Sequence, residues 1–194
     1  SHMTPAEPYY ADMTAVYPYD PGKARALLQE AGYGSGLRLT LSLPHQYRYT
    51  VRAGEIVADQ LRRVGIEVDI ELVEWATWLS RIFGEAEYDL TIIGHAEPMD
   101  IGIYANPSYY FRYDSPVVRE LLQAARQTGD EHERADLYRR VQAQLAEDAV
   151  NAWLYARPYF VGSAADGHYR RNRGVHRPLI ATCSRTFYVV PSRS

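Results

Sequence analysis

Cysteine is almost absent from this chain, since Cys183 is the single cysteine among 194 residues. One thiol excludes an internal disulfide and any zinc site built from several cysteines. No run of about 18 apolar residues is present, so the sequence predicts no membrane-spanning helix. The formal net charge is only −3. This near balance of charge gives no support to a nucleic-acid partner.

Short motifs for catalysis and metal binding are missing as well. The histidines show no H-x-H or H-E-x-x-H spacing, so we expect no metal site. Ser35 lies in Gly34-Ser35-Gly36, which is not the G-x-S-x-G turn of serine hydrolases. These glycines also fall between a predicted helix and a predicted strand, the reverse of the order in a phosphate-binding loop. We therefore expect neither a metal nor a cofactor.

Tyrosine is abundant, with 17 tyrosines against only 4 phenylalanines. A tyrosine joins a large apolar area to a polar tip, a combination that suits binding surfaces. Half-buried surface positions nevertheless account for most tyrosines in an ordinary domain. Hydrophobic residues at 46% and charged residues at 23% are typical of one globular domain.

The hydrophobic pattern alternates between strand and helix along the chain. Asp20 can cap a helix that begins at Pro21 and stops at Gly32. Alternating apolar residues predict strands over 37–43 and 66–72, and a more continuous apolar run predicts one over 88–93. A strand returning to the sheet is expected over 151–155, and 186–190 also has a strand-like sequence. Further helices are expected over 50–64, 75–82, 115–125 and 130–148, with Ser115 and Asp130 as caps of the last two. This order predicts an α/β fold with a mixed, mostly parallel sheet flanked by helices.

The apolar faces of the helices are expected to face the core. Trp78 is assigned to this core, and the other positions expected to face inward are Ala24, Leu27, Leu28, Ala31, Ile56, Val57, Leu61, Val64, Leu79, Ile82, Val118, Leu121, Leu122, Ala125, Leu137, Val141 and Leu145.

Four segments are distinguished along the chain. Residues 1–3 have the sequence left by cleaving an expression tag, and residues 4–19 are an extended, proline-containing lead-in. Residues 20–162 carry the α/β pattern. The pattern fails over 163–194, where arginines and other polar residues dominate.

The segment DPGKARALLQEAGY at positions 20–33 resembles a signature of the family 5 extracellular solute-binding proteins of ABC importers, the peptide- and nickel-binding group. LRRVGIEVDI at 61–70, a tryptophan-containing helix, and GEAEYDL at 84–90 follow in the order found in that family. The resemblance extends over about 15–160. It implies the carboxy-terminal lobe of a two-lobed periplasmic binding protein-like fold.

The resemblance also implies a function without catalysis. Such a protein captures a small solute, for example a peptide, an opine-like or a sugar-like compound, and delivers it to permease subunits in the membrane. The implied location is the periplasm, or the cell exterior with a membrane tether. The natural chain would carry a signal peptide and a first lobe upstream, and residues 163–194 would return toward that first lobe.

Residues 94–113 form the best candidate for a binding segment. This stretch has no regular period and follows the third predicted strand, and in open α/β sheets ligands collect at the carboxyl ends of strands. Its carboxylates can pair with an ammonium group or accept bonds from hydroxyls, and its aromatic rings can enclose apolar parts. Trp75 is added because it begins a helix near the end of another strand. The expected ligand-binding residues are Trp75, His95, Glu97, Met99, Asp100, Tyr104 and Tyr109.

In the family, the corresponding strand ends in G-W-x-x-D, and in peptide binders that aspartate meets the amino terminus of the ligand. Here the sequence is GHAEPMD at 94–100, with His95 in the place of tryptophan. Either Glu97 or Asp100 supplies the acid.

Other interpretations stay open. In a purely structural interpretation, Glu97 and Asp100 cap local backbone and the tyrosines cover the core. A hydrolase using the acids of 94–113 and a protein–protein module with a tyrosine-rich face are the alternative functions. The arginine-rich stretch 170–177 is interpreted as a solvated segment facing the first lobe rather than a nucleic-acid patch.

Overall fold

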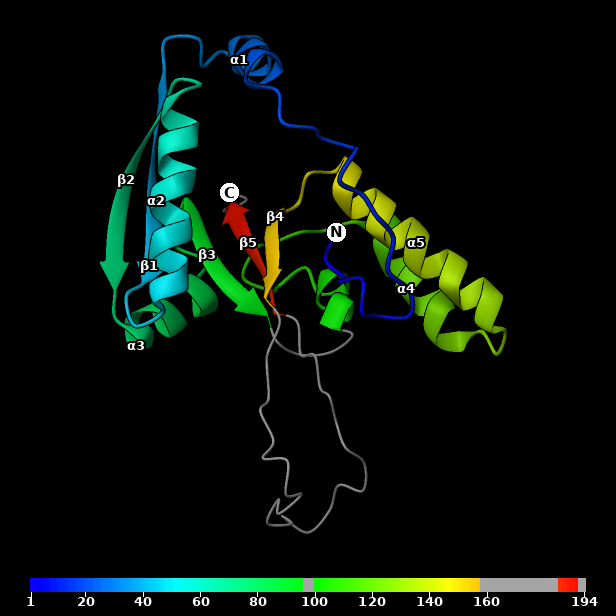
Figure 1. The fold of residues 1–194 in the computed structure, drawn as a ribbon. Coiled ribbons are helices and arrows are strands. Elements are labelled where there is room, and N and C mark those ends of the chain that lie inside the picture. The colour runs from blue at the N-terminus through cyan, green and yellow to red at the C-terminus, as the bar shows by residue number, and fades with distance from the viewer. Residues whose placement is uncertain (96–99, 158–184, 192–194) are drawn as a thin grey trace, which may run out of the picture.

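The computed structural model of the chain describes residues 1–95, 100–157 and 185–191 (Figure 1). Its five-stranded sheet has the order β2-β1-β3-β5-β4. β1 pairs in parallel with β2 and β3, whereas β5 pairs antiparallel with β3 and β4. The strands are β1 (Leu37–Pro44), β2 (Ile66–Val73), β3 (Leu90–His95), β4 (Ala152–Arg157) and β5 (Arg185–Pro191).

Helices lie on both sides of this sheet. α2 packs along β1 and β2, and α4 and α5 pack against each other on the other side of the molecule (Figure 1). The predicted helix over 75–82 is a short α-turn continued by a π-helix. The helices are α1 (Pro21–Glu30), α2 (Arg48–Arg62), α3 (Trp75–Thr77), the π-helix η1 (Trp78–Gly84), the 3-10 helix η2 (Asp100–Ala105), α4 (Pro116–Gln127) and α5 (Glu131–Glu147). The predicted α/β fold with a mixed sheet is confirmed.

Side-chain caps fix where three helices begin. Asp20 accepts a hydrogen bond from the Lys23 amide at 2.9 Å, and Asp130 accepts one from the His132 amide at 2.7 Å. The Ser115 hydroxyl accepts from the Val118 amide at 3.4 Å. All three predicted caps are confirmed, because each carries a short side-chain oxygen just before a helix.

Two predicted apolar faces are wrong in detail. No residue of α1 is buried, and Leu27 is 49% exposed because nothing in the described structure covers its face of the helix. Ile56 of α2 is 60% exposed. The residues of α2 that are buried are Thr50, Gly54 and Ala58, because α2 approaches β1 so closely that only small side chains fit between them.

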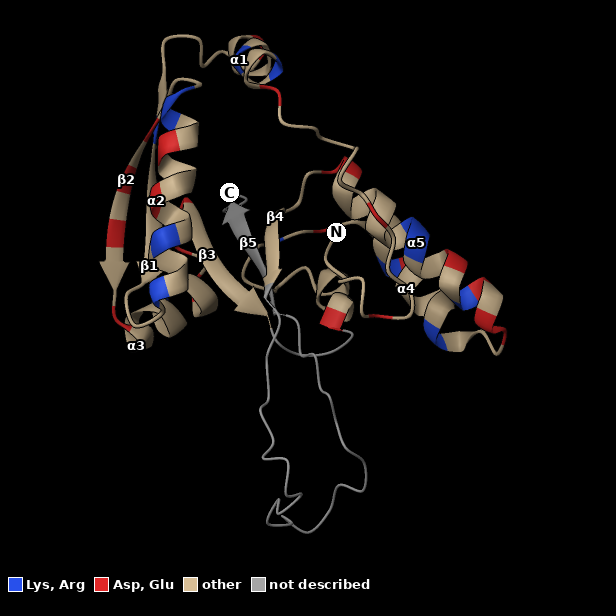
Figure 2. Ribbon diagram, viewed as in Figure 1, with Lys and Arg blue, Asp and Glu red and all other residues tan. Residues whose placement is uncertain are grey.

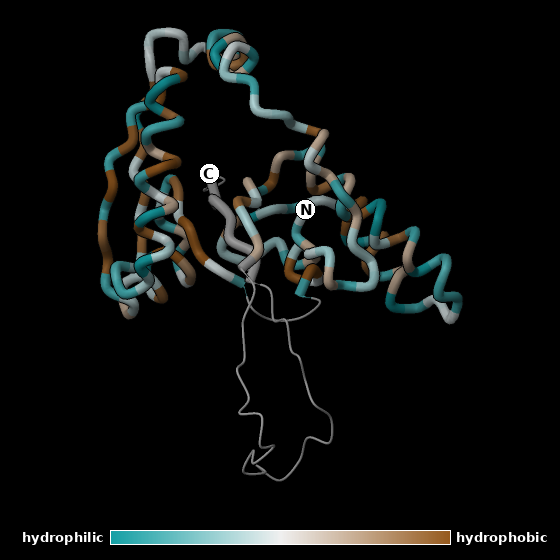
Figure 3. The backbone as a smooth tube through the Cα atoms, viewed as in Figure 1, coloured by the Kyte–Doolittle hydropathy of each residue, from teal (hydrophilic) through white to brown (hydrophobic). Residues whose placement is uncertain are grey.

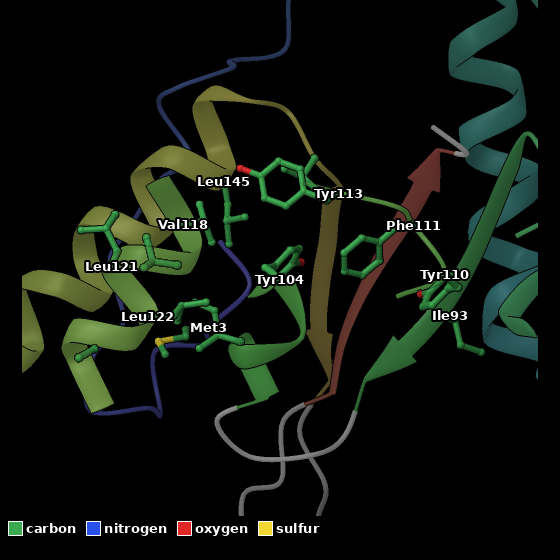
Figure 4. Close-up of a cluster of buried hydrophobic side chains, with 14 of the residues drawn as sticks. Met3, Ile93, Tyr104, Tyr110, Phe111, Tyr113, Val118, Leu121, Leu122 and Leu145 are labelled. Atoms are coloured by element: carbon green, nitrogen blue, oxygen red, sulfur yellow. The ribbon is translucent and has the colours of Figure 1, made fainter. Parts of the chain in front are cut away.

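The apolar core is divided between the two faces of the sheet. Leu90 and Ile92 of β3 pack with α2, whereas Ile93 lies beside Tyr110 and belongs to the cluster that also contains residues of α4 and α5 (Figure 4). Successive residues of a strand point to opposite faces, so β3 contributes to both clusters. In Figure 3, hydrophobic stretches of the backbone recur on the strands and on the facing helices, while Figure 2 shows charged residues on α2, β2 and α5.

Part of the segment 101–113 packs into the core, although residues 106–108 and Arg112 are exposed and the sequence suggested a long loop at a binding surface. Tyr104, Tyr110, Phe111 and Tyr113 are each no more than 2% exposed; Tyr104 and Tyr113 lie toward α4 and α5, whereas Tyr110 lies beside β3 (Figure 4). The alternative interpretation, in which the tyrosines cover the core, therefore holds for Tyr104, Tyr110 and Tyr113.

The first residues of the chain are also well packed. His2 and Met3 are 5% and 2% exposed, while the origin of residues 1–3 as a tag remnant stays a prediction. The buried side chain of Gln142 holds residues 1–11, the N-terminal strap, against α5: its amide nitrogen donates to the Tyr9 carbonyl at 2.7 Å, and its amide oxygen accepts from the Ala11 amide at 3.2 Å. The Tyr9 ring stacks on Tyr138 with centroids 4.7 Å apart.

One strand of the sheet comes from the segment 163–194. β5 lies between β3 and β4, so the described part of that segment completes the sheet of this lobe. Glu97, Met99, Cys183 and the arginine-rich stretch 170–177 lie outside the described residues.

Candidate functional site

Asp100 is the centre of the candidate site. It begins η2, just beyond the carboxyl end of β3, and its side chain is 15% exposed. His95 Nδ1 lies 2.8 Å from Asp100 Oδ2, and His2 Nε2 lies 2.5 Å from Asp100 Oδ1. The carboxylate is therefore held between two imidazole rings, one from β3 and one from the N-terminal strap.

The charge state of Asp100 follows from these contacts. Burial of the carboxyl group acts to raise its pKa, but the hydrogen bonds with His2 and His95 outweigh burial and hold the pKa of Asp100 well below its ordinary value of 3.8. Asp100 is thus ionised at neutral pH, and an ionised carboxylate only accepts hydrogen bonds. The site can bind a donor group of a ligand, such as an ammonium, an imidazole N–H or a hydroxyl.

Tyr104 extends the site into the core. Its hydroxyl lies 3.2 Å from His2 Nδ1 and accepts a hydrogen bond from Asn151 Nδ2 at 2.8 Å. Complete burial raises the pKa of the Tyr104 phenol, which therefore keeps its proton. Tyr104 is both a core residue and a hydrogen-bonding residue of the site.

Aromatic rings flank the polar groups. The ring of Tyr109 meets that of His95 at a centroid distance of 6.3 Å and that of Phe83 at 5.6 Å. Trp75 stacks in parallel on Trp78 with centroids 5.0 Å apart, and its edge contact with Tyr47 has a centroid distance of 5.4 Å. Tyr109 therefore gives an apolar border beside His95, whereas Trp75 packs against Trp78 and Tyr47.

The structure brings most of the predicted site residues together. His95, Asp100, Tyr104 and Tyr109 form one contiguous group, whereas the rings of Trp78, Tyr110 and Tyr109 separate Trp75 from His95. Trp78, expected in the core, is 3% exposed and donates from Nε1 to the Thr91 hydroxyl at 3.0 Å.

Sequence reasoning missed two residues of the site. His2 was set aside with the first three residues, and no local pattern relates it to Asp100, which is 98 positions away. Asn151 was assigned only to a strand, and it lies immediately before β4, 4% exposed. A buried asparagine beside a strand was the one available sign, since buried amides require hydrogen-bond partners.

Two further features were sought within residues 1–95, 100–157 and 185–191. No group of three or more His, Cys, Asp or Glu side chains in these ranges is arranged to hold a metal ion. None of the helices described there combines the length and the apolar composition needed to cross a membrane.

Comparison with known proteins shows to which family the chain belongs. Residues 1–116 match the model of the bacterial extracellular solute-binding proteins, family 5 Middle. The chain is 28% identical over 155 residues to the dipeptide-binding protein of Escherichia coli K12, covering 72% of this chain and 29% of that protein. It is 30% identical over 148 residues to di/tripeptide-binding protein 4 of Pseudomonas aeruginosa UCBPP-PA14, covering 69% of this chain and 27% of that protein.

A solved structure gives the same result for the fold. The periplasmic binding protein DppA from Helicobacter pylori, in complex with the peptide STSA, superposes with a TM-score of 0.64 at 27% identity, covering 75% of this chain and 30% of that chain. The chain therefore spans less than a third of the length of these relatives. The matched family model covers more than half of the chain, and the chain belongs to the bacterial extracellular solute-binding proteins of family 5.

Proposed function

We propose that this chain is the carboxy-terminal, solute-binding lobe of the binding protein of an ABC importer. It captures a small solute at the end of β3 and holds it without making or breaking a bond. The observation that carries the proposal is the ionised, half-enclosed carboxylate of Asp100, ringed by hydrogen-bonding and aromatic side chains.

Peptides are the first solute class to test. An ionised carboxylate that is only 15% exposed favours a charged or strongly polar donor group, since fewer water molecules screen it. The relatives above are named as dipeptide- and di/tripeptide-binding proteins, and the Helicobacter pylori structure contains a peptide. Opine-like and sugar-like solutes also carry donor groups for Asp100, and the ring of Tyr109 lies beside His95 in the same site.

The proposal includes the partners and the location of the protein. A first lobe of the same protein closes over the solute, and permease subunits in the membrane receive it. This places the protein in the periplasm, or outside the cell on a membrane tether. Support comes from membership of the family of extracellular solute-binding proteins.

Calorimetry on this chain tests the role of Asp100. A panel of di- and tripeptides is titrated into the wild type and into Asp100→Asn, and we expect the variant to bind at least about tenfold more weakly, a loss of about 1.4 kcal/mol. Asp69→Asn is the matched control, because Asp69 lies on β2 with a side chain 58% exposed. Equal affinities for the wild type and Asp100→Asn would contradict the proposal.

The same samples separate binding from the two alternative functions. Mass spectrometry after prolonged incubation is expected to recover the peptides intact. Hydrolysis that is lost in Glu97→Gln or Asp100→Asn would instead establish the hydrolase. Solute-induced NMR shifts at His95 and Tyr109 are expected, whereas a docking module would show no such shifts with any small solute.

A further inference from the structure

His2 contacts the candidate site as a bound ligand would. Its imidazole reaches Asp100 Oδ1 from Nε2 at 2.5 Å and the Tyr104 hydroxyl from Nδ1 at 3.2 Å. The ring stands edge-on to Tyr104, with centroids 5.2 Å apart and planes at 89°. The side chain of His2 is only 4% exposed.

The partners of the ring suit one arrangement of donor and acceptor. The Tyr104 hydroxyl already accepts from Asn151 Nδ2 at 2.8 Å, so its own hydrogen is available for His2 Nδ1. Asp100 is ionised and can only accept, so it takes the hydrogen of His2 Nε2. The neutral Nε2–H imidazole satisfies both partners at once.

This pattern discriminates between chemical groups. An ammonium or a guanidinium can donate to Asp100, but in the place of the His2 ring it offers no acceptor to the hydrogen of the Tyr104 hydroxyl. Leaving a buried polar group unpaired is costly. A planar ring with one N–H and one acceptor nitrogen on opposite sides fits both partners, and an imidazole has this form.

The receiving residues do not belong to the strap. Asp100 and Tyr104 are in η2, and Asn151 precedes β4, so the chemistry that they select is the same whichever molecule supplies the ring. The strap itself is held to α5 by separate contacts of Gln142 and Tyr9.

We propose that Asp100, Tyr104 and Asn151 form an imidazole site, filled here by His2 of the same chain and available to a histidine-bearing solute when the strap leaves. The part concerning the solute rests on the proposed function. The part concerning the site itself rests on the contacts of His2 alone.

Chemical rescue tests the site. The variant His2→Ala lacks the ring. Free imidazole that binds the emptied site is expected to stabilise the folded variant by RT ln(1 + [L]/Kd), which is measured as a rise in its melting temperature. The wild type, whose site is filled, is expected to show no such rise. 1-Methylimidazole lacks the N–H for Asp100 and pyrrole lacks the acceptor for Tyr104, so each is expected to bind at least tenfold more weakly than imidazole.

Matched variants test whether the stabilisation by imidazole is specific to the site of His2. His132→Ala, at an exposed position of α5, is expected to show no stabilisation by imidazole. The double variant His2→Ala/Asp100→Asn is expected to lose the rescue. Equal stabilisation of the wild type and His2→Ala, or a rescue that survives in the double variant, would overturn the proposal.

A measurement on the wild type is independent of how well the variants fold. The 15N spectrum of the His2 ring is expected to show a fixed Nε2–H tautomer. A ring that exchanges between tautomers as free histidine does would overturn the proposal.

Dipeptides distinguish the two sources of the ring. Glycyl-histidine is expected to bind His2→Ala at least tenfold more tightly than glycyl-alanine, and equal binding would overturn the part concerning the solute. If imidazole rescues while no peptide binds any form of the chain, the site stands as the receptor of His2 and the proposed function fails.

Discussion

Gly54 is the residue at which α2 comes closest to the sheet. A Cβ at this position would collide with Leu43 Cδ1 and would lie 3.3 Å from Leu41 Cδ2. Both leucines are completely buried and have little room to move. Gly54→Ala is therefore expected to lower the free energy of unfolding by about 1–3 kcal/mol, measured by urea denaturation. Gly129→Ala is the control, since no atom lies within 4 Å of its added Cβ, and an equal loss in both variants would contradict the expectation.

Asp100 gives a second prediction at the scale of one residue. Its folded-state pKa lies below the ordinary 3.8, so its ionisation stabilises the fold above that pH, and the contribution is lost as the pH falls below it. The melting temperatures of the wild type and Asp100→Asn are therefore expected to differ by a constant amount above about pH 5 and to converge at lower pH. A difference that does not depend on pH would show that the carboxylate has no such role.

The residue scale also shows where sequence reasoning stops. The segment after β3 was identified because a polar, aromatic stretch followed a buried strand. The surroundings of Asp100 and Tyr104 include His2 and Asn151, respectively, which are distant in sequence. Such contacts are made by the tertiary fold and leave no local pattern. For the same reason the burial of Tyr104 could not be read from its neighbours.

Among the elements, α1 and α5 differ although both begin with an aspartate cap. Asp20 caps a helix with no buried residue, whereas Asp130 caps one that buries Leu137, Val141 and Leu145. Removing a cap costs about 1 kcal/mol of helix stability. Asp130→Ala is expected to lower the melting temperature of the whole chain, while Asp20→Ala increases only local hydrogen exchange in α1. Equal losses of melting temperature would contradict this difference.

The elements themselves were predictable, but the coverage of their faces was not. Periodicity located the strands and helices because apolar spacing and caps are local. Periodicity also predicted a buried apolar face for α1 and a buried Ile56. In the described structure no residue of α1 is buried, and Ile56 is exposed. A period shows that a helix has two faces, whereas burial depends on what packs against them.

At the scale of the whole molecule, β3 links the two apolar clusters. The three tryptophans all lie in or against the cluster beside α4 and α5, while the other cluster is formed by α2, β1 and β2. Because β3 contributes to both, we expect one cooperative transition. Tryptophan fluorescence and far-UV circular dichroism are therefore expected to give the same urea midpoint. Separate midpoints would show that the clusters unfold independently.

The partial length of the chain has an effect on affinity. A solute enclosed by two lobes makes only part of its contacts with one of them, and each 1.4 kcal/mol lost corresponds to about a tenfold weaker Kd. We expect this chain to bind its solute far more weakly than a longer protein that also contains the first lobe. Equal dissociation constants by calorimetry would contradict that expectation.

The place of β5 between β3 and β4 has a consequence for biosynthesis. A ribosome releases β1, β2 and β3 long before β5, and β4 joins the sheet only through β5. During most of translation one edge of β3 is therefore without its partner. Open strand edges are templates for pairing with other chains. This sheet is therefore most exposed to aggregation just before β5 emerges, and β3, which becomes its central strand, needs protection longest.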